Sequence, residues 1–279
     1  MWLETLQEIQ RLQQEAKANG YPLWFRGQRD AAWPLLSSIH RDVNASFQAV
    51  YGDISQAPPE AEKLALMREV YKTLFYKFKS RAIQLLTEHE RNDWGVVFAM
   101  QHLGLPTRLL DWTESFPCAL YFAQLRRKSS DDAAIFVFTP QQHNQSIVGS
   151  EGVVWLGGNA NRINIVDTHS YHPAVVGSGN DLETLAVEPE LTNPRMAAQR
   201  SAFTLCGASF EPLELKYPRH IKKLVLPYQE FKEVGAFLDL AGQSHFGYFP
   251  DLEGLRDYLL AGMEQEMVLA KEWLVKNRG

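Results

Sequence analysis

The stretch Gln101–Ala123 (QHLGLPTRLLDWTESFPCALYFA) constrains the fold most, because it places charged and polar residues in a short connection between two apolar helical patterns. The pattern of Trp94–Leu103 predicts a mostly buried helix, which Gly104 and Pro106 end. A second helix is expected after Thr113, which stands where an N-cap residue belongs. The connection therefore holds its polar side chains close to a helix N-terminus.

Three side chains of this connection, Arg108, Asp111 and Thr113, are candidates for a functional site. Backbone N–H groups at a helix N-terminus point outward and favour anions. Asp111 already carries negative charge there, so the connection is only half of a site. We expect Arg26 and Gln199, from distant parts of the chain, to complete it.

Composition narrows the function classes. The chain has 279 residues, 45% of them hydrophobic, which is enough to bury a sizeable core. Its net charge of −5 argues against broad binding of nucleic acid, although a local basic patch is still possible. Cys118 and Cys206 form neither a disulfide framework nor a metal-ligand spacing. With no signal-peptide pattern and no apolar run of about 18–20 residues, a cytoplasmic protein without membrane contact is expected.

Helical patterns fill the first half of the chain, and short strand patterns dominate the middle and third quarter. This order predicts an α+β fold: a single compact domain with a helical N-terminal half packed on a small, mostly antiparallel sheet. One domain is expected over residues 1–279, with a core at about 20–240 flanked by helices 2–19 and 251–277. A loop is expected over 45–59. The strand candidates are 23–25, 133–139, 153–156, 163–166, 174–176, 201–207 and 221–227.

Arginines near glycine mark a second part of the site. Arg26 ends a short apolar strand pattern and is followed by Gly27 and Gln28, and a glycine lets another group approach the backbone closely. Guanidinium groups bind phosphate or carboxylate through paired hydrogen bonds. Arg41 and Arg108 add two further guanidinium groups, so a phosphate-bearing ligand such as a nucleotide is the expected partner.

Structural interpretations of the same residues stay open. Arg26 or Arg108 could form an ion pair with Asp111 that only ties a strand to a loop. His102, at the end of an apolar helix, fits a buried core histidine as well as a catalytic base. No metal site is expected, because the two histidines that flank Tyr171 have no acidic partner at ligand spacing.

Three segments of the chain resemble the FRG domain family. They are Trp24–Gly27 (WFRG), the QHLGLPTRLLDWT and ALYFA parts of the central stretch, and Asn193–Phe203 (NPRMAAQRSAF). The family is named for its Phe-Arg-Gly signature, carried here by residues 25–27. The resemblance extends over about residues 20–240 and implies an FRG-like domain, but it does not by itself define an activity.

A more distant resemblance is to the ADP-ribosyltransferase fold. That fold combines a strand ending in Arg-Gly, a Ser/Thr element leading into an A-x-x-F-A helix, and a strand that opens at a catalytic polar residue. The matching positions are Arg26, Thr113 with Ala119–Ala123, and Gln199. This resemblance implies NAD as the cofactor. Gln199 stands where the family has a Glu, and since an amide supplies no negative charge, Asp111 would have to provide it.

Three functions therefore remain open. The first is an ADP-ribosyltransferase-like enzyme that uses NAD or a related nucleotide, with Asp111, Gln199 and His102 as catalytic residues. Its cofactor-binding residues would be Arg26, Gly27, Gln28, Arg41, Arg108 and Thr113. The second is a non-catalytic module that binds phosphate or nucleic acid, and the third is a structural Arg–Asp network. The sequence does not indicate the target, the pathway or the oligomeric state.

Overall fold

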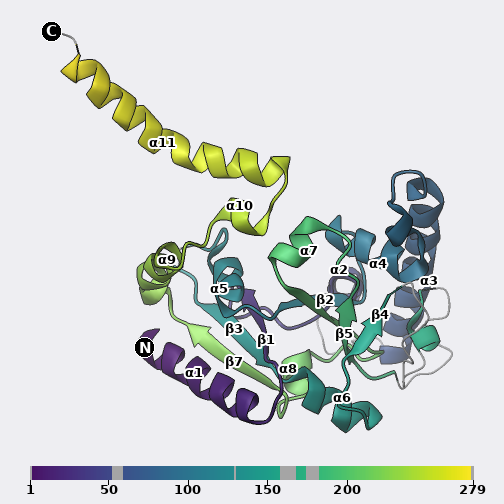
Figure 1. Cartoon of the computed structure of the whole chain (residues 1–279). Coiled ribbons are helices and arrows are strands. Elements are labelled where there is room, and N and C mark those ends of the chain that lie inside the picture. The colour runs from purple at the N-terminus through teal and green to yellow at the C-terminus, as the bar shows by residue number, and fades with distance from the viewer. Residues whose placement is uncertain (1, 52–58, 129, 158–167, 174–181, 278–279) are drawn as a thin grey trace.

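A seven-stranded sheet runs through the protein, which we describe from a computed structural model of residues 2–51, 59–128, 130–157, 168–173 and 182–277 (Figure 1). The strand order is β4-β5-β6-β2-β1-β3-β7, and the paired strands are antiparallel except for β4 and β5. This arrangement confirms the predicted α+β class. The strands are β1 (Trp24–Gln28), β2 (Leu109–Thr113), β3 (Ala133–Phe138), β4 (Val154–Leu156), β5 (Leu185–Pro189), β6 (Ser201–Leu205) and β7 (Ile221–Leu226).

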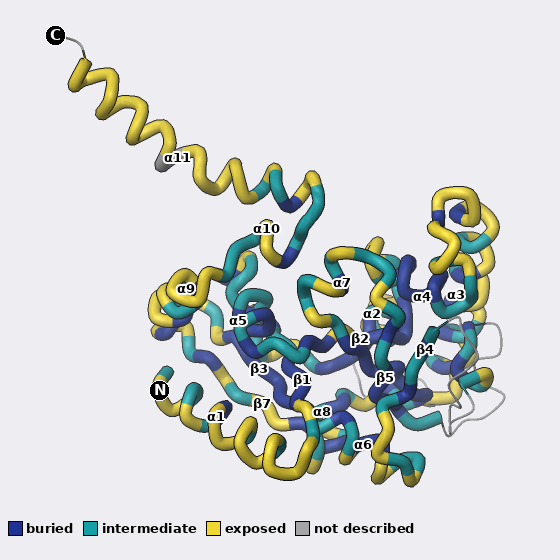
Figure 2. The backbone as a smooth tube through the Cα atoms, viewed as in Figure 1, coloured by how far each residue is buried: buried dark blue, intermediate teal, exposed yellow. Residues whose placement is uncertain are grey.

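The helices include three long ones and several short ones. The α-helices are α1 (Trp2–Ala18), α2 (Ser38–Tyr51), α3 (Glu60–Ala82), α4 (Asp93–His102), α5 (Phe116–Gln124), α6 (Pro140–Val148), α7 (Pro194–Ala198), α8 (Leu213–Lys216), α9 (Phe231–Leu240), α10 (His245–Tyr248) and α11 (Leu252–Lys276). Within the described residues, three single turns of 3₁₀-helix accompany them: η2 (Glu88–Arg91), η3 (Thr168–Tyr171) and η4 (Tyr228–Glu230). Figure 2 shows that α11 is exposed over most of its length.

Two helical groups pack against different parts of the sheet. Helices α1, α5 and α9 form one apolar cluster with β1, β3 and β7, in which Phe25 and Ala119 are buried. Helices α2, α3 and α4 form a second cluster with β2, β5 and β6, around Met67 and Leu109. The centre of the sheet, where β1 lies beside β2, is therefore the place where these two groups meet.

Gly27 fixes how closely α5 approaches β1. A Cβ atom at this position would lie 1.8 Å from the backbone oxygen of Ala119, a distance that no side chain can tolerate. The expectation that this glycine permits a close backbone approach is correct. The group that approaches is the helix α5, which presents the small residues Ala119 and Ala123 to the strand.

The central stretch differs locally from the prediction. Leu109–Thr113 is a strand and not a connecting loop, since it pairs with β6 along its whole length. The predicted N-cap at Thr113 is wrong: Ser115 caps α5 by accepting a hydrogen bond from the Cys118 N–H at 3.4 Å. Thr113 ends the strand and accepts a 3.0 Å bond from the Ser115 N–H.

Other sequence predictions have mixed outcomes. The loop expected from residue 45 is wrong up to Tyr51, because α2 continues to that residue and buries Val43 on its inner side. The strands expected at 133–139, 153–156, 201–207 and 221–227 are present within a residue or two. The candidates at 163–166 and 174–176 lie outside the described residues. Strand β5 and helix α6 were not predicted.

Candidate functional site

A cavity of about 710 Å³ opens where the two helical groups meet at the centre of the sheet. This volume lies within the range of about 300–1,000 Å³ that ligand pockets occupy. Segments that are distant in the sequence line it, among them the end of β1, the region from the end of α4 through β2, helix α5, and the segment from α7 to β6. The residues predicted for the site that line the cavity are Arg26, Gly27, Gln28, Arg41, His102, Asp111, Thr113 and Gln199.

The cavity lies where β1 and β2 part. These strands share a single paired position, Phe25 with Thr113, whereas β2 pairs with β6 along five residues. Beyond Phe25, a side chain and not a backbone pair links the two strands: Arg26 Nη1 donates a 2.7 Å hydrogen bond to the backbone oxygen of Asp111. The same nitrogen lies 3.7 Å from the Asp111 carboxylate, so the predicted Arg26–Asp111 ion pair is present.

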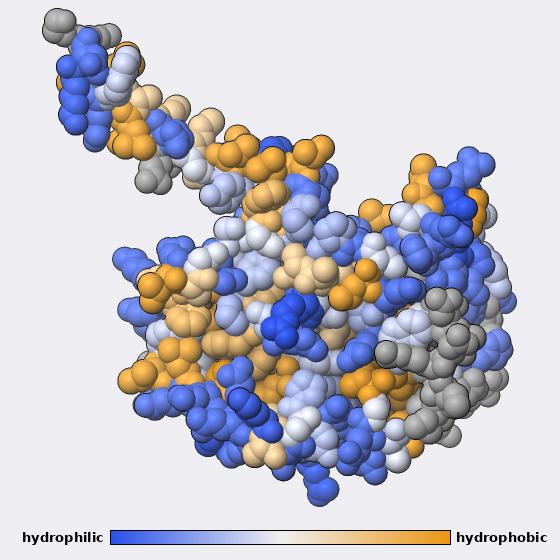
Figure 3. Space-filling view, in the orientation of Figure 1, coloured by the Kyte–Doolittle hydropathy of each residue, from blue (hydrophilic) through white to orange (hydrophobic). Residues whose placement is uncertain are grey.

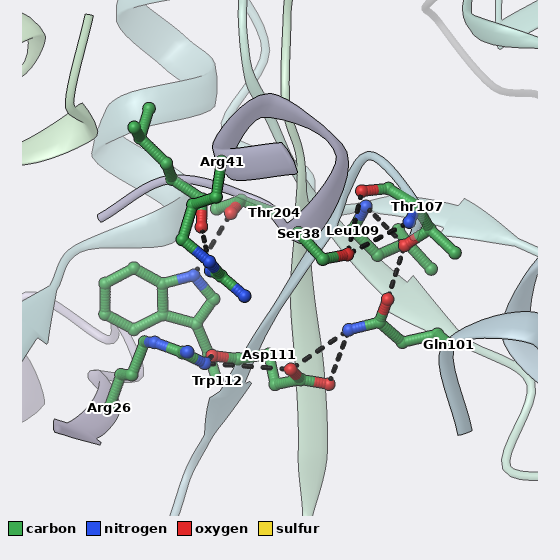
Figure 4. Close-up of polar contacts among 10 residues, drawn as sticks. Arg26, Ser38, Arg41, Gln101, Thr107, Leu109, Asp111, Trp112 and Thr204 are labelled. Atoms are coloured by element: carbon green, nitrogen blue, oxygen red, sulfur yellow. Dashed lines mark hydrogen bonds and ion pairs between the residues drawn. The ribbon is translucent and has the colours of Figure 1, made fainter. Parts of the chain in front are cut away.

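A polar relay holds Asp111 in place (Figure 4). Gln101 Nε2 donates to both carboxylate oxygens of Asp111, at 3.1 and 3.0 Å. The Gln101 side-chain oxygen in turn accepts a hydrogen bond from the Thr107 hydroxyl. Thr107 is fully buried, and its backbone N–H donates a 3.0 Å bond to the Ser38 hydroxyl. Groups on α2, on α4 and in the connection before β2 thus orient the carboxylate, while more than half of the surface of the Asp111 side chain stays exposed.

Thr113 and Gln199 are joined by a hydrogen bond. The Thr113 hydroxyl donates a 2.6 Å hydrogen bond to the backbone oxygen of Gln199, which caps the C-terminus of α7. The Gln199 side chain is turned toward α10, where its Nε2 donates a 3.0 Å bond to the Tyr248 backbone oxygen. The two residues therefore form one unit that links β2, α7 and α10.

Positive charge and aromatic rings dominate the lining. Among the described residues that line the cavity, Asp111 is the only acidic one, against the five arginines Arg26, Arg29, Arg41, Arg126 and Arg195. Two of these stack on rings: the guanidinium of Arg29 lies 4.9 Å from the centre of Trp33, and that of Arg195 lies 4.8 Å from Phe249. Such a lining attracts a ligand that has both negative charge and flat apolar surface.

Burial lowers the pKa values of two residues that line the cavity, Arg26 and His102. It lowers the pKa of the Arg26 guanidinium, an effect that Asp111 opposes and the nearby Arg41 reinforces. An arginine nevertheless stays protonated in proteins, so Arg26 is a charge that is costly to leave without anionic partners. Burial and the charge of Arg195 lower the pKa of His102 as well, which favours its neutral form. The interpretation of His102 as a buried core residue is wrong, because the residue is exposed at the cavity.

Several buried polar atoms of the lining have no hydrogen-bond partner among the described residues. They are Gln28 Oε1, Arg26 Nε and Arg195 Nε. Gln28 is only 6% exposed, so its side-chain oxygen is an acceptor turned away from bulk solvent. Because buried polar atoms in folded proteins are nearly always hydrogen-bonded, these atoms suit a ligand that offers both donors and acceptors.

Arg108 is the one predicted site residue that does not line the cavity. Its side chain is completely buried, with the guanidinium 5.5 Å from the ring of Tyr171. None of its three guanidinium nitrogens has a hydrogen-bond partner among the described residues. Burial lowers its pKa, and Tyr71, Cys206 and Tyr171 stand close enough to oppose that effect. Arg108 belongs to the interior beside the site.

Comparison with known proteins relates one segment of the chain to a family. Residues 21–132 match the FRG domain family, and this segment contributes Arg26, Arg41, His102, Asp111 and Thr113 to the cavity. The chain contains an FRG domain. No curated protein and no solved structure matched the chain. The matched segment ends at residue 132, just before β3, so the wider extent of the domain, to about residue 240, stays a prediction.

Some residues that line the cavity are not predicted from the sequence. The sequence pattern identifies Gln101 only as the first residue of the central motif, although its amide orients Asp111. Arg195 and Phe249 were not assigned at all. The sequence signal for Arg195 is its place in the NPRMAAQRSAF segment, two residues after the N-cap residue Asn193. Phe249 lies in a short connection after α10, where sequence carried no such signal.

Metal ligation and membrane insertion find no support in the described parts of the chain. Over those residues, no group of three or more His, Cys, Asp or Glu side chains is arranged to hold a metal ion. In the same residues, no helix combines the length and the apolar composition that a membrane span needs. Cys118 and Cys206 are free and buried, and burial raises their pKa values to about 12 and about 11.

Proposed function

We propose that the FRG domain of this protein binds NAD or a related nucleotide in the central cavity and transfers its ADP-ribosyl group. The observation that carries the proposal is the convergence of five arginines, one oriented carboxylate and several aromatic rings in one cavity. A dinucleotide offers matching features, since it has a negatively charged pyrophosphate, two flat ring systems and ribose hydroxyl groups. The resemblance to the ADP-ribosyltransferase fold supports the same ligand.

The residues present fit such a ligand. Arg26 and Arg41 would hold the pyrophosphate, because both guanidinium groups line the cavity and a guanidinium pairs with two phosphate oxygens at once. Gln28 Oε1 would accept a hydrogen bond from a ribose hydroxyl, which would satisfy its buried and unpartnered oxygen. Trp33 or Phe249, each already stacked with an arginine, would cover a ring of the ligand.

Asp111 is the group that would assist chemistry. NAD, when bound, supplies a sugar carbon from which nicotinamide can leave, and positive charge develops at that carbon during transfer. A fixed carboxylate stabilises such charge because it needs no reorganisation during the reaction. Gln101 keeps both oxygens of Asp111 in place. His102, neutral and exposed at the same cavity, would accept a proton from the attacking group.

Gln199 would have a positioning role. Its amide donates to the Tyr248 backbone oxygen, so it fixes the wall formed by α7 and α10. It carries no charge, and removal of a preorganised electrostatic group costs on the order of 10²–10³ in rate. We therefore expect a slow enzyme whose activity depends on Asp111.

Release of nicotinamide from NAD tests the proposal. The wild-type protein should release nicotinamide, and Asp111→Asn should bind NAD but lose most of the release, since the amide keeps the shape and removes the charge. Asp239→Asn is a matched control, because Asp239 is exposed on α9 and does not line the cavity. Absence of both NAD binding and nicotinamide release in the wild-type protein would refute the proposal.

A second candidate is binding of a phosphate-bearing ligand without reaction. The observation that favours it is Gln199, which supplies no charge and whose amide is already bonded to α10. In this case nucleotide binding would weaken as salt rises, Asp111→Asn would not reduce it, and no nicotinamide would be released. The cytoplasmic location expected from the sequence stays a prediction under either function.

A further inference from the structure

Helix α11 projects from the body of the protein and is exposed over most of its length (Figures 1 and 2). Its 25 residues span about 37 Å at 1.5 Å per residue. Figure 3 shows apolar residues along it, away from the sheet and its covering helices. Many of its large apolar residues are about half exposed or more, including Leu260, Met263, Met267, Trp273 and Leu274. An apolar surface of this size on a projecting helix needs a partner.

The spacing of these residues identifies the kind of partner. Leu260, Met263, Met267, Ala270 and Leu274 follow one another at intervals of three, four, three and four residues. This is the a/d repeat of a coiled coil, in which apolar side chains of two helices interlock along one seam. The repeat covers two heptads in the outer part of α11, where neither the sheet nor the short helix α10 contacts it in Figure 1.

Charged residues on the two sides of this seam match a second copy of the same helix. With Leu260 at position a, Glu266 falls at position g and Lys271 at position e. In a parallel pair of helices, a g residue lies beside the e residue five positions later on the partner. Glu266 of each copy would therefore face Lys271 of the other, twice in one dimer.

The overall charge of α11 argues against a lipid surface as the partner. The helix contains five acidic residues and three basic ones, so anionic lipid headgroups would repel it. Interfacial helices instead carry mainly Lys and Arg on their polar face. The charges therefore favour another protein helix, and the complementary pair at Glu266 and Lys271 favours this one.

The base of α11 is anchored, so its outer part has a defined direction. Asp251 caps the helix by accepting from the Gly254 N–H at 2.8 Å and forms an ion pair with Arg195. Asp257, one and a half turns further, lies 3.7 Å from Nε2 of His245, whose Nδ1 is 2.6 Å from the Tyr121 hydroxyl. The helix thus leaves the body at the wall of the cavity that Arg195 lines.

We propose that α11 pairs with α11 of a second copy of this chain as a parallel two-stranded coiled coil over residues 260–274. A seam of two heptads is short, so the dimer forms reversibly. In a parallel pair the two bodies lie at the same end of the coil, and each cavity wall is tied to the dimer through Arg195 and Asp251. The inference does not depend on the proposed function.

Sedimentation equilibrium over a wide range of protein concentration tests the pairing. The wild-type chain should pass reversibly from monomer to dimer. Met263→Glu and Met267→Glu should each raise the dissociation constant by about 100-fold or more, since they place facing carboxylates in an apolar seam. Val268→Glu, at position b outside the seam and equally exposed, should leave it unchanged. Thermal unfolding should be the same for all three variants because these side chains are exposed in the monomer.

A charge exchange tests the orientation of the pair. Glu266→Lys alone and Lys271→Glu alone should each weaken dimerisation, because like charges then face each other. A mixture of the two variants should restore it by forming a mixed dimer, as a parallel pair requires. A chain that stays monomeric at all concentrations would overturn the proposal, as would a dimer that Met263→Glu leaves intact. Restoration that fails in the mixture would overturn the parallel arrangement. Binding of the monomeric chain to phosphatidylcholine vesicles would assign the apolar face to lipid.

Discussion

Arg26 and Arg108 lie on neighbouring segments at the centre of the protein, yet the structure gives them opposite surroundings. Arg26 reaches into the cavity, bonds to the Asp111 backbone and faces its carboxylate. Arg108 is buried beside Tyr171 and has no hydrogen-bond partner among the described residues. The same side chain can therefore belong to a ligand site or to the interior, and access to an open cavity distinguishes the two.

The largest effect is expected from the interior arginine. Arg108→Ala should lower the free energy of unfolding by about 3–5 kcal/mol, because it empties the space of a large, fully buried side chain. Arg108→Met should cost less than about 1.5 kcal/mol, since it refills the space and removes a buried charge. Chemical denaturation of the two variants measures both values. Equal losses would mean that the charge of Arg108, and not its volume, stabilises the fold.

A smaller loss of stability is expected at the cavity. Arg26→Ala should cost about 1.5–3 kcal/mol, the range for a hydrogen bond to a charged group, because it frees the Asp111 backbone oxygen that faces β1. The same denaturation experiment measures it, with Arg219→Ala as a control at an exposed arginine outside the cavity. If Arg26→Ala were as damaging as Arg108→Ala, the Arg–Asp network would be chiefly structural.

The stability of the fold should decrease in acid, because a buried histidine lies near the charge of Arg108. Burial, with the charge of Arg108 as a second cause, lowers the pKa of His40 to about 3 from 6.5. The unfolded chain therefore binds a proton below pH 6.5 that the folded chain does not bind, so the contribution of His40 to stability is constant above that pH and falls between pH 6.5 and 3. The slope for one histidine is about 1.4 kcal/mol per pH unit. His143, with its pKa lowered to about 4 by burial, acts in the same direction.

Thermal unfolding as a function of pH measures this slope. Arg108→Met should make it shallower in the lower part of the range, because the pKa of His40 rises when the neighbouring charge is removed. Arg26→Ala should leave the slope of the wild-type protein unchanged. A slope unaffected by Arg108→Met would show that burial alone sets the pKa of His40.

The smallest effect concerns the orientation of Asp111. Gln101→Ala removes both hydrogen bonds to the carboxylate, so nicotinamide release should fall by about tenfold while NAD affinity changes little. Gln145→Ala, at an exposed position on α6, is the control. Unchanged release in Gln101→Ala would mean that Asp111 does not need this support. Loss of NAD affinity would instead assign Gln101 to the ligand.

Local sequence patterns predicted some features of the fold and of the cavity and missed others. The Gly27 constraint, the helix from residue 94 and the strand from Ala133 follow from local patterns, and the convergence of Arg26, Asp111 and Gln199 is present. Local pattern could not place Arg108, because its burial depends on Tyr71 and Tyr171 from distant segments.

The strand β2 was missed for a related reason. Its sequence LLDWT alternates apolar and polar residues only from Leu110 to Thr113, and its identity as a strand depends on pairing with β6, more than 80 residues later. The role of Gln101 depends in the same way on tertiary contacts, since its amide acts only because β2 brings Asp111 beside the end of α4. Pairing between distant segments, and not propensity, decides both.

Calorimetric titration of NAD into the wild-type protein, Arg26→Ala and Arg108→Met tests the central claim most directly. If the cavity beside Arg26 is the ligand site, Arg108→Met binds NAD as the wild-type protein does, and Arg26→Ala binds it about 10–100-fold more weakly. Equal affinity of Arg26→Ala and the wild-type protein, or loss of binding in Arg108→Met alone, would contradict the account.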